Sequence, residues 1–264
     1  MDWYWLKGKK YFKKDYTYVM NFDTNLWYET DKMFNWYWYE GVHAISNRRM
    51  TYLNGIVTKY FWRDEYEALS TKLWSNLSKK NSIFIDVGSH TGIYSIIGNL
   101  SNIKNITVSI EPYFLNYARL LTNLRLNNIP TINCFCYAVL NEPGLVNFKI
   151  STNNYYHTMG GKVEETGDLK VKALTLDNLK FDNTRKRIEA IKIDTEGSED
   201  KVLEGSKKLI NKNKPDFLIE YNKNSYEKCL KILEQYNYSF YFLDDNNKKL
   251  ITREDFESNK SKYI

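Results

Sequence analysis

The sequence predicts an α/β fold whose sheet is mostly parallel and is covered by helices on both faces. From residue 82 onward, short apolar runs typical of strands alternate with segments whose apolar residues repeat at helical spacing. Two further strand-like runs close the chain and favour an antiparallel edge. The length of 264 residues fits one such domain of about 180 residues plus an extension.

Each element follows from its local pattern. Phe114, Tyr117, Ala118, Leu121 and Leu124 form one helical stripe that should face the sheet. Asn141-Glu142-Pro143-Gly144 has the composition of a turn. Strands are expected at 83–87, 106–110, 131–138, 189–194, 216–221, 238–243 and 248–252. The segment 146–176 should be rich in β-structure and contain a polar loop. Further helices are expected at 92–100, around 202–210 and around 226–233.

The N-terminal part of the chain differs in composition from the rest. All seven tryptophans lie between Trp3 and Trp74, and no proline occurs before Pro112. We therefore interpret residues 1–80 as an aromatic-rich N-terminal extension and residues 81–264 as the main domain. The rings around Trp36 and Trp38 would form a subdomain core or a homodimer contact, or else a platform on which a sugar or base stacks.

Composition also limits the protein's surroundings and cofactors. The N-terminal residues lack the apolar stretch of a signal peptide, and no segment reaches the roughly 18 to 20 apolar residues of a membrane span, so a cytoplasmic protein is expected. Cys134, Cys136 and Cys229 are predicted to be small core residues, and three histidines offer no zinc constellation. The net charge of +6 comes from scattered lysines, typical of a solvated surface or of an anionic partner.

A nucleoside-binding corner is the most informative motif. The apolar run before Asp86 leads into Asp-x-Gly-x-x-x-Gly, where Gly88 permits a tight turn and Gly92 lets the following helix pack closely. This is neither the spacing of a dinucleotide site nor a phosphate loop. Glu111 ends the next strand and could accept both hydroxyl protons of a ribose. Together these strand ends predict a site for S-adenosylmethionine (SAM).

A second cluster carries a resemblance to a known family. The run Lys-Ile-Asp-Thr-Glu-Gly-Ser-Glu at 192–199, Val-Leu-Glu-Gly-Ser at 202–206, Thr-Leu-Asp at 175–177 and Pro-Asp-Phe-Leu-Ile-Glu at 215–220 occur in order. With Tyr66-Glu67 upstream, they resemble the FkbM family of SAM-dependent methyltransferases. The resemblance implies a Rossmann-like class I methyltransferase fold with about seven mostly parallel strands. It also implies methyl transfer to a hydroxyl oxygen, often on sugars or on polyketide-type products, and a sugar is the acceptor we expect first.

The resemblance also implies residue roles. Asp86, Gly88, Ser89, His90, Thr91 and Gly92 would form the loop at the methionine side of the cofactor. Glu111 and Pro112 would lie at the ribose, Ala138 near the adenine, and Asp194 beside the reacting end. His90 departs from the pattern, because the family usually has Asn there; the imidazole could still donate a hydrogen bond to the cofactor carboxylate.

The chemistry requires an oxygen nucleophile held in line with the sulfonium and a group that takes its proton. The candidate proton acceptors are Asp194, Glu196, His157 and Glu220, and no metal is expected. His157 has a suitable ordinary pKa but sits in a loop. Asp194 and Glu196 follow a strand expected to be adjacent to the one that carries the cofactor loop, which ranks them first.

Two other functions stay open at this stage. An RNA ribose 2′-O-methyltransferase would suit the basic, aromatic composition, but that family uses a Lys-Asp-Lys-Glu tetrad with lysine where this chain has Glu220. A catalytically silent SAM-binding or structural subunit is the non-enzymatic reading, against which the intact Asp86, Gly88, Glu111 and Asp194 argue. The expected partner is a hydroxyl-bearing small molecule or glycan rather than a nucleic acid.

Overall fold

The computed structural model describes residues 67–150, 160–181 and 186–260, together with the backbone of four short strands near the N-terminus. These strands form two antiparallel pairs, β1 (Trp3–Leu6) with β2 (Lys9–Phe12) and β3 (Thr17–Asn21) with β4 (Leu26–Thr30). The predictions for Trp36, Trp38 and His157 lie outside the described residues.

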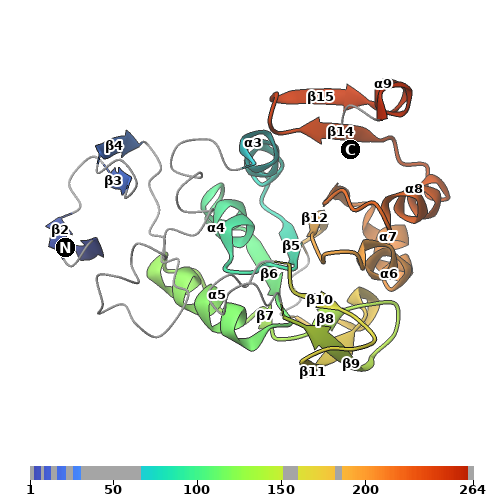
Figure 1. The fold of residues 1–264 in the computed structure, drawn as a ribbon, viewed down its shortest axis with the longest axis horizontal. Coiled ribbons are helices and arrows are strands. Elements are labelled where there is room, and N and C mark those ends of the chain that lie inside the picture. The colour runs from blue at the N-terminus through green and yellow to red at the C-terminus, as the bar shows by residue number, and fades with distance from the viewer. Residues whose placement is uncertain are drawn as a thin grey trace.

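A five-stranded parallel sheet forms the centre of the described domain (Figure 1). Its order is β13 (Asp216–Ile219), β12 (Ile188–Ile193), β5 (Ile83–Val87), β6 (Ile106–Ile110) and β7 (Cys134–Phe135). β5 and β6 begin and end where the sequence predicts. β5 lies between β6 and β12, so the segments that follow these three strands meet at one edge of the sheet.

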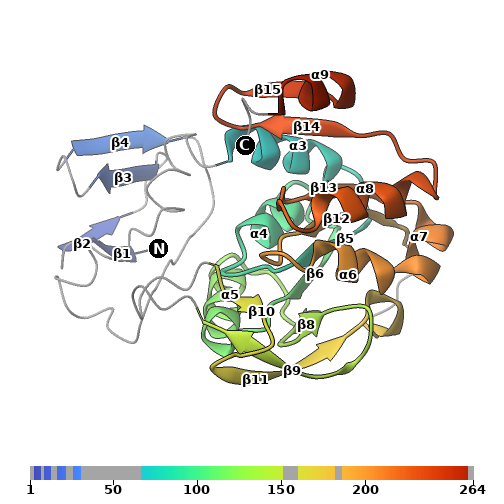
Figure 2. The same cartoon turned by 45° about the vertical axis from the view of Figure 1, so that its right-hand side comes forward.

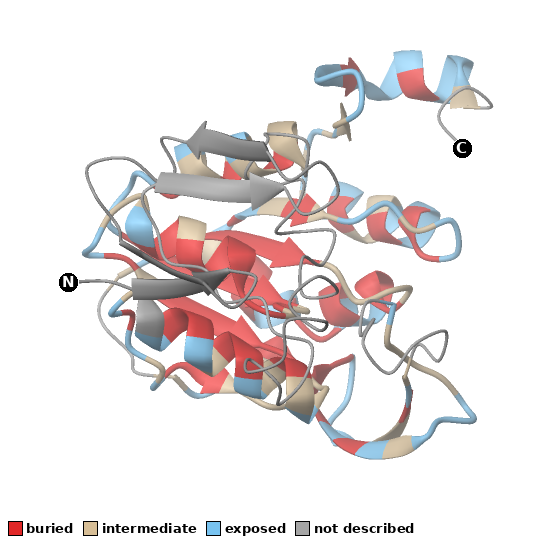
Figure 3. Ribbon diagram, turned by 60° about the vertical axis from the view of Figure 1, so that its left-hand side comes forward, coloured by how far each residue is buried: buried red, intermediate tan, exposed pale blue. Residues whose placement is uncertain are grey.

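Strand alternation directs different side chains to the two faces of the sheet. Ile83, Ile85 and Val87 share one apolar cluster with residues of α6 (Glu199–Glu204), α7 (Lys207–Asn213) and α8 (Tyr226–Glu234). Phe84 instead packs on Trp74 and Tyr94, under α3 (Ala68–Leu77) and α4 (Ile93–Leu100). With α5 (Phe114–Leu126) beside α4, both faces are covered, and the strands are buried between helices (Figure 3).

The predicted strand at 131–138 is two strands in different sheets. After β7 the chain leaves the parallel sheet, and β8 (Ala138–Val139) pairs with β11 (Leu169–Leu174). The second sheet has the order β10 (Lys162–Val163), β9 (Gly144–Lys149), β11 and β8, and the short helix η1 (Leu176–Asn178) follows it. The apolar pattern runs unbroken through both strands, so only the pairing partners show the break.

The expected sheet of about seven strands has five in the described residues, because the C-terminal hairpin does not join it. β14 (Tyr241–Asp244) and β15 (Lys249–Thr252) pair only with each other and lead into α9 (Arg253–Ser258). The hairpin lies over α3 (Figure 2), where Asp245 accepts hydrogen bonds from Leu69 N (2.6 Å) and Ser70 N (3.0 Å). Asp245 thus caps α3 across the sequence.

None of the helices in the described part of the chain combines the length and apolar character of a membrane span.

Candidate functional site

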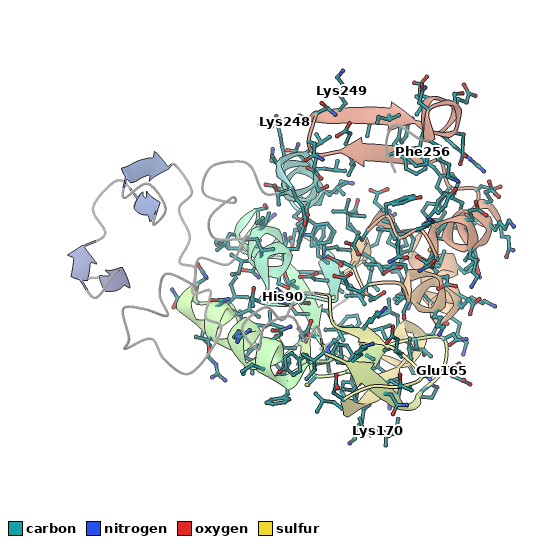
Figure 4. All side chains as sticks on the ribbon, viewed as in Figure 1. His90, Glu165, Lys170, Lys248, Lys249 and Phe256 are labelled. Atoms are coloured by element: carbon teal, nitrogen blue, oxygen red, sulfur yellow. The ribbon has the colours of Figure 1, made fainter. Side chains whose placement is uncertain are left out.

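A cleft opens where β5, β6 and β12 end, between the parallel sheet and the second sheet. Its empty volume is about 750 Å³, including the part open to solvent. Figure 4 shows His90 near the middle of the molecule, whereas Glu165 and Lys170 lie on the outer side of the second sheet. The lining residues are Val87, Gly88, His90, Ile110, Glu111, Pro112, Asn116, Tyr137, Ala138, Val139, Phe148, Gly160, Gly161, Val163, Asp194, Thr195, Glu196 and Ser198.

The turn from β5 into α4 requires glycine for two separate reasons. Gly88 has φ +73°, and a Cβ there would lie 1.7 Å from the carbonyl oxygen of Asp194. The close approach that demands this glycine is therefore the end of β12. Gly92 has φ +94°, and its Cβ would lie 2.5 Å from Leu120 Cδ1 on α5. His90 also has a positive φ of 49°, in the left-handed region that Asn and His tolerate better than most residues.

The residues predicted to bind the cofactor fall into two groups. Gly88, His90, Glu111, Pro112, Ala138 and Asp194 line the cleft. The other four, Asp86, Ser89, Thr91 and Gly92, are not among its lining residues.

The polar members of this second group are buried and hold the turn in shape. Asp86 accepts from Ser95 Oγ at 2.6 Å. Ser89 Oγ donates to the Asp86 carbonyl oxygen (2.6 Å) and accepts from Ile110 N (2.9 Å). The Thr91 carbonyl oxygen accepts from the side chain of Asn123 at 2.8 Å. Some residues of the Asp86–Gly92 motif therefore hold the turn in its conformation, and others line the cleft.

Glu111 connects the two strand ends that the sequence singles out. One carboxylate oxygen accepts from His90 N at 2.9 Å and the other from Tyr113 N at 3.0 Å. The residue is 5% exposed, and burial raises the pKa of its carboxyl group to about 7 in spite of these hydrogen bonds. An ionised carboxylate offers about four lone-pair sites, so it retains capacity for a ligand hydroxyl.

His90 is held as a neutral imidazole. Burial and the nearby charges of Arg119 and Lys192 lower the pKa of His90 to about 3, against a smaller opposing effect of Asp194. A neutral ring has one donor and one acceptor nitrogen. It can therefore give a hydrogen bond to a carboxylate, as the Asn expected here would.

Three carboxyl groups converge at the ends of β12 and β13. One oxygen from each of Asp194, Glu196 and Glu220 lies within 4.8 Å of the others. Glu220 is exposed when the whole residue is considered, but its carboxyl group lies among these neighbours. Burial of that group, together with the charges of Asp194 and Glu196, raises the pKa of Glu220 to about 9. Burial and the same kind of repulsion raise the pKa of Glu196. Glu220 therefore carries a proton at neutral pH and donates it in a hydrogen bond to Asp194.

Asp194 is the member of this group whose pKa is lowered. Burial alone would raise the pKa of Asp194, but the ammonium of Lys192 and its hydrogen bond outweigh that effect and lower the pKa. Lys192 Nζ lies 2.7 Å from Asp194 Oδ2, and the lysine side chain is 8% exposed. Sequence reasoning overlooked this lysine. A lysine within the otherwise apolar end of the strand 188–193 was the available signal, since a buried charge requires a partner.

Glu199 shapes the turn that carries the acids. It is fully buried, and one oxygen accepts from Thr195 N (3.1 Å), Thr195 Oγ1 (2.9 Å) and Gly197 N (2.9 Å). The other oxygen accepts from Ser225 Oγ, at the start of α8, at 2.5 Å. The sequence suggests only a helix-start acid here. In the structure Glu199 fixes the loop that presents Asp194 and Glu196.

The arrangement combines a carboxylate suited to a ribose, a neutral hydrogen-bonding ring and a protonatable acid cluster around one cleft. The family model of the methyltransferase FkbM domain matches residues 86–240, more than half of the chain. The chain belongs to the FkbM methyltransferase family. No curated protein matches.

Two solved structures are similar to parts of the chain. A methyltransferase FkbM from Methylobacillus flagellatus KT is 18% identical over 58% of this chain, with a TM-score of 0.42, and the match spans only 37% of that protein. A precorrin-6y C5,15-methyltransferase from Geobacter metallireducens GS-15 is 10% identical over 66% of this chain and 72% of its own, with a TM-score of 0.38.

Proposed function

We propose that this FkbM-family methyltransferase uses SAM to methylate a hydroxyl oxygen of a small molecule or glycan, with a sugar as the preferred acceptor. The observation that carries the proposal is the placement of Glu111 and Asp194 on one cleft, at the ends of β6 and β12, the two parallel strands that flank β5. Ligands of open parallel sheets bind at this edge.

The residues around the cleft suit the cofactor. Glu111, once ionised, accepts hydrogen bonds from ribose hydroxyls, and His90 donates from its neutral ring to a carboxylate. Gly88 and Ala138 leave room because they carry little or no side chain. When bound, SAM supplies a methyl group already activated by the sulfonium charge.

The acid cluster supports transfer to an alcohol rather than to a stronger nucleophile. An alcohol has to lose its proton as its oxygen attacks, so a nearby proton acceptor is needed. Asp194 is ionised and takes the proton of the alcohol at a carboxylate oxygen, which makes its carboxyl group neutral, and the carboxyl groups of Glu196 and Glu220 lie beside it. Before that step, the ammonium of Lys192 balances the negative charge of Asp194. This scheme uses no metal, which stays a prediction.

The first experiment measures SAM binding by calorimetry. Replacing Glu111 by Ala removes two charge-assisted hydrogen bonds worth roughly 1.5 to 3 kcal/mol each, so affinity should fall at least tenfold. Glu165→Ala is the control, because Glu165 is exposed and is not among the residues that line the cleft. Unchanged affinity in a folded Glu111→Ala protein would sink the ribose assignment.

The acceptor is then sought by incubating labelled SAM with nucleotide-sugars, glycans and RNA and recording the mass gain of one methyl group. Methylated RNA ribose would replace the sugar proposal by the RNA alternative, and tight SAM binding without turnover would favour the silent subunit. Activity that is lost with EDTA and restored by magnesium would contradict the metal-free scheme.

A further inference from the structure

Lys192 occupies an unusual position for a lysine. Its backbone lies in the middle of the sheet, in register with Asp86 on β5 and Leu218 on β13, and the residue is 7% exposed. Desolvating an ammonium is expensive unless it is paired and hydrogen-bonded. A structural apolar residue would fill this position at lower cost, so the charge itself calls for an explanation.

The surroundings of the ammonium are built from four parts of the chain. Asp194 follows β12 and receives its hydrogen bond at 2.7 Å. Tyr94 on α4 places its ring face against the ammonium, 4.6 Å from Nζ to the ring centroid. The charges of Asp86 on β5 and Glu67 ahead of α3 also act on it, and the Tyr94 hydroxyl donates to the Glu67 carboxylate.

These contacts leave the ammonium little freedom to move or to lose its proton. Burial alone would lower the pKa of Lys192, but the charges of Asp194, Asp86 and Glu67 outweigh it and raise the pKa. The lysine therefore stays charged at neutral pH. It does not line the cleft, whereas Asp194 does.

We propose that Lys192 is a positioning residue, which fixes the orientation and the negative charge of Asp194 at the cleft and thereby sets the lower pH limit of catalysis. Without it, the titratable neighbours of Asp194 would include the carboxyl groups of Asp86, Glu111, Glu196 and Glu220 and the neutral ring of His90, none of which supplies a positive charge. The catalytic part of this inference rests on the proposed function. The electrostatic part does not, because it concerns the protein without ligand.

The decisive experiment is a titration of the aspartate carboxyl groups by ¹³C NMR, with Asp194 assigned through Asp194→Asn. Lys192→Met keeps an unbranched stem and removes the charge. We expect the titration midpoint of Asp194 to rise by at least one pH unit, a tenfold change in its ionisation constant. Lys201→Met removes an exposed lysine of α6 and should leave the midpoint unchanged. An unchanged midpoint in folded Lys192→Met protein overturns the proposal.

Two further variants keep the test decisive. If Lys192→Met does not fold, Lys192→Gln replaces it, since the amide retains a hydrogen-bond donor without the charge, and the same rise is expected. Tyr94→Phe keeps the ring under the ammonium and removes only the hydroxyl bond to Glu67. It should leave the midpoint of Asp194 in place, and a rise as large as that of Lys192→Met would assign the effect to Glu67 instead.

Kinetics then separate this proposal from the proposed function. In Lys192→Met the acidic limb of turnover should move upward by the same amount as the NMR midpoint, with SAM affinity within about threefold of the native value. A shifted midpoint with an unmoved acidic limb would overturn the catalytic role of Lys192. Absence of SAM binding in the native protein would instead overturn the proposed function and leave the NMR result standing.

Discussion

Burial of Glu111 gives one residue a pH response near neutrality. Its folded pKa of about 7 lies above the ordinary value of 4.5, so its contribution to stability is present below pH 4.5 and is lost as the pH rises through 7. Ligand binding has the opposite preference, because ribose hydroxyls donate to the ionised carboxylate.

SAM affinity should therefore increase with pH. About a tenth of the Glu111 carboxyl groups are ionised at pH 6 and about nine tenths at pH 8. The dissociation constant for SAM should therefore be roughly tenfold larger at pH 6 than at pH 8. Calorimetry at pH 6, 7 and 8 measures this, and Glu111→Gln should remove the dependence. A native protein whose affinity is the same at all three values would contradict the prediction.

Asp194 is the residue we expect to accept the proton. Asp194→Asn should lower turnover by about 10² or more, the usual scale for a general base, with a smaller change in acceptor binding. Single-turnover methyl transfer measured against pH tests this.

His157→Ala serves as the comparison for Asp194→Asn, because His157 was the loop candidate and lies outside the described residues. Near-normal rates for Asp194→Asn would remove it from catalysis. Loss of an acidic limb near pH 6.5 only in His157→Ala would assign the base to the histidine.

At the scale of elements, the cleft depends on how closely β5 and β12 approach at their ends. Gly88 allows this approach, and its N–H donates to Ile110 O on β6 at 2.9 Å. Asp194 N donates to Val87 O at 3.1 Å on the other side. A side chain at position 88 would enter the space that the Asp194 carbonyl group fills.

Gly88→Ala should therefore destabilise the protein strongly. The new Cβ would lie 1.7 Å from backbone oxygen, and φ +73° is strained for alanine, so we expect a loss of more than about 3 kcal/mol in the free energy of unfolding. Gly144→Ala is the matched control. A Cβ there meets nothing within 4 Å, and the change should be neutral or stabilising by up to about 1 kcal/mol. Equal urea midpoints for the two variants would refute the argument.

At the scale of the whole molecule, the central sheet is enclosed by helices, and Trp74 of α3 belongs to its core. Trp74 is fully buried, packs edge-on against Phe84 and Tyr94, and donates from Nε1 to Tyr94 O at 2.9 Å. This tryptophan therefore supports the sheet rather than an aromatic surface. The tryptophans before residue 67 retain the role proposed from sequence, in the acceptor site or a subunit contact.

Replacing Trp36 and Trp38 together by Ala should spare SAM binding, because all cleft residues lie after residue 86. Calorimetry with SAM and gel filtration of the same variant measure the two properties separately. We expect unchanged affinity together with weaker acceptor turnover or a smaller assembly. A fall in SAM affinity with the fold intact would show that this division of labour is wrong.

Local patterns determined the parts of this protein that depend only on neighbouring residues. Apolar runs predict the strands at 83–87 and 106–110, and apolar residues at helical spacing predict the helix from Phe114 to Leu124. Both patterns depend only on residues close together in sequence. The turn around Gly88 and the acid at the end of the next strand, Glu111, could be predicted because they too depend on the local sequence. The order of motifs also led to the FkbM family, and the family model agrees.

Tertiary structure decided what depends on partners distant in sequence. The break between β7 and β8 arises because β8 pairs with β11, and the C-terminal hairpin stays off the sheet while Asp245 caps α3. The sequence does not place Lys192 near Asp86 or Tyr94, and only the register of β12 with β5 and the packing of α4 bring it to them. Burial and neighbouring charge, which shift the pKa values of His90, Glu111 and Asp194, exist only once the chain has folded.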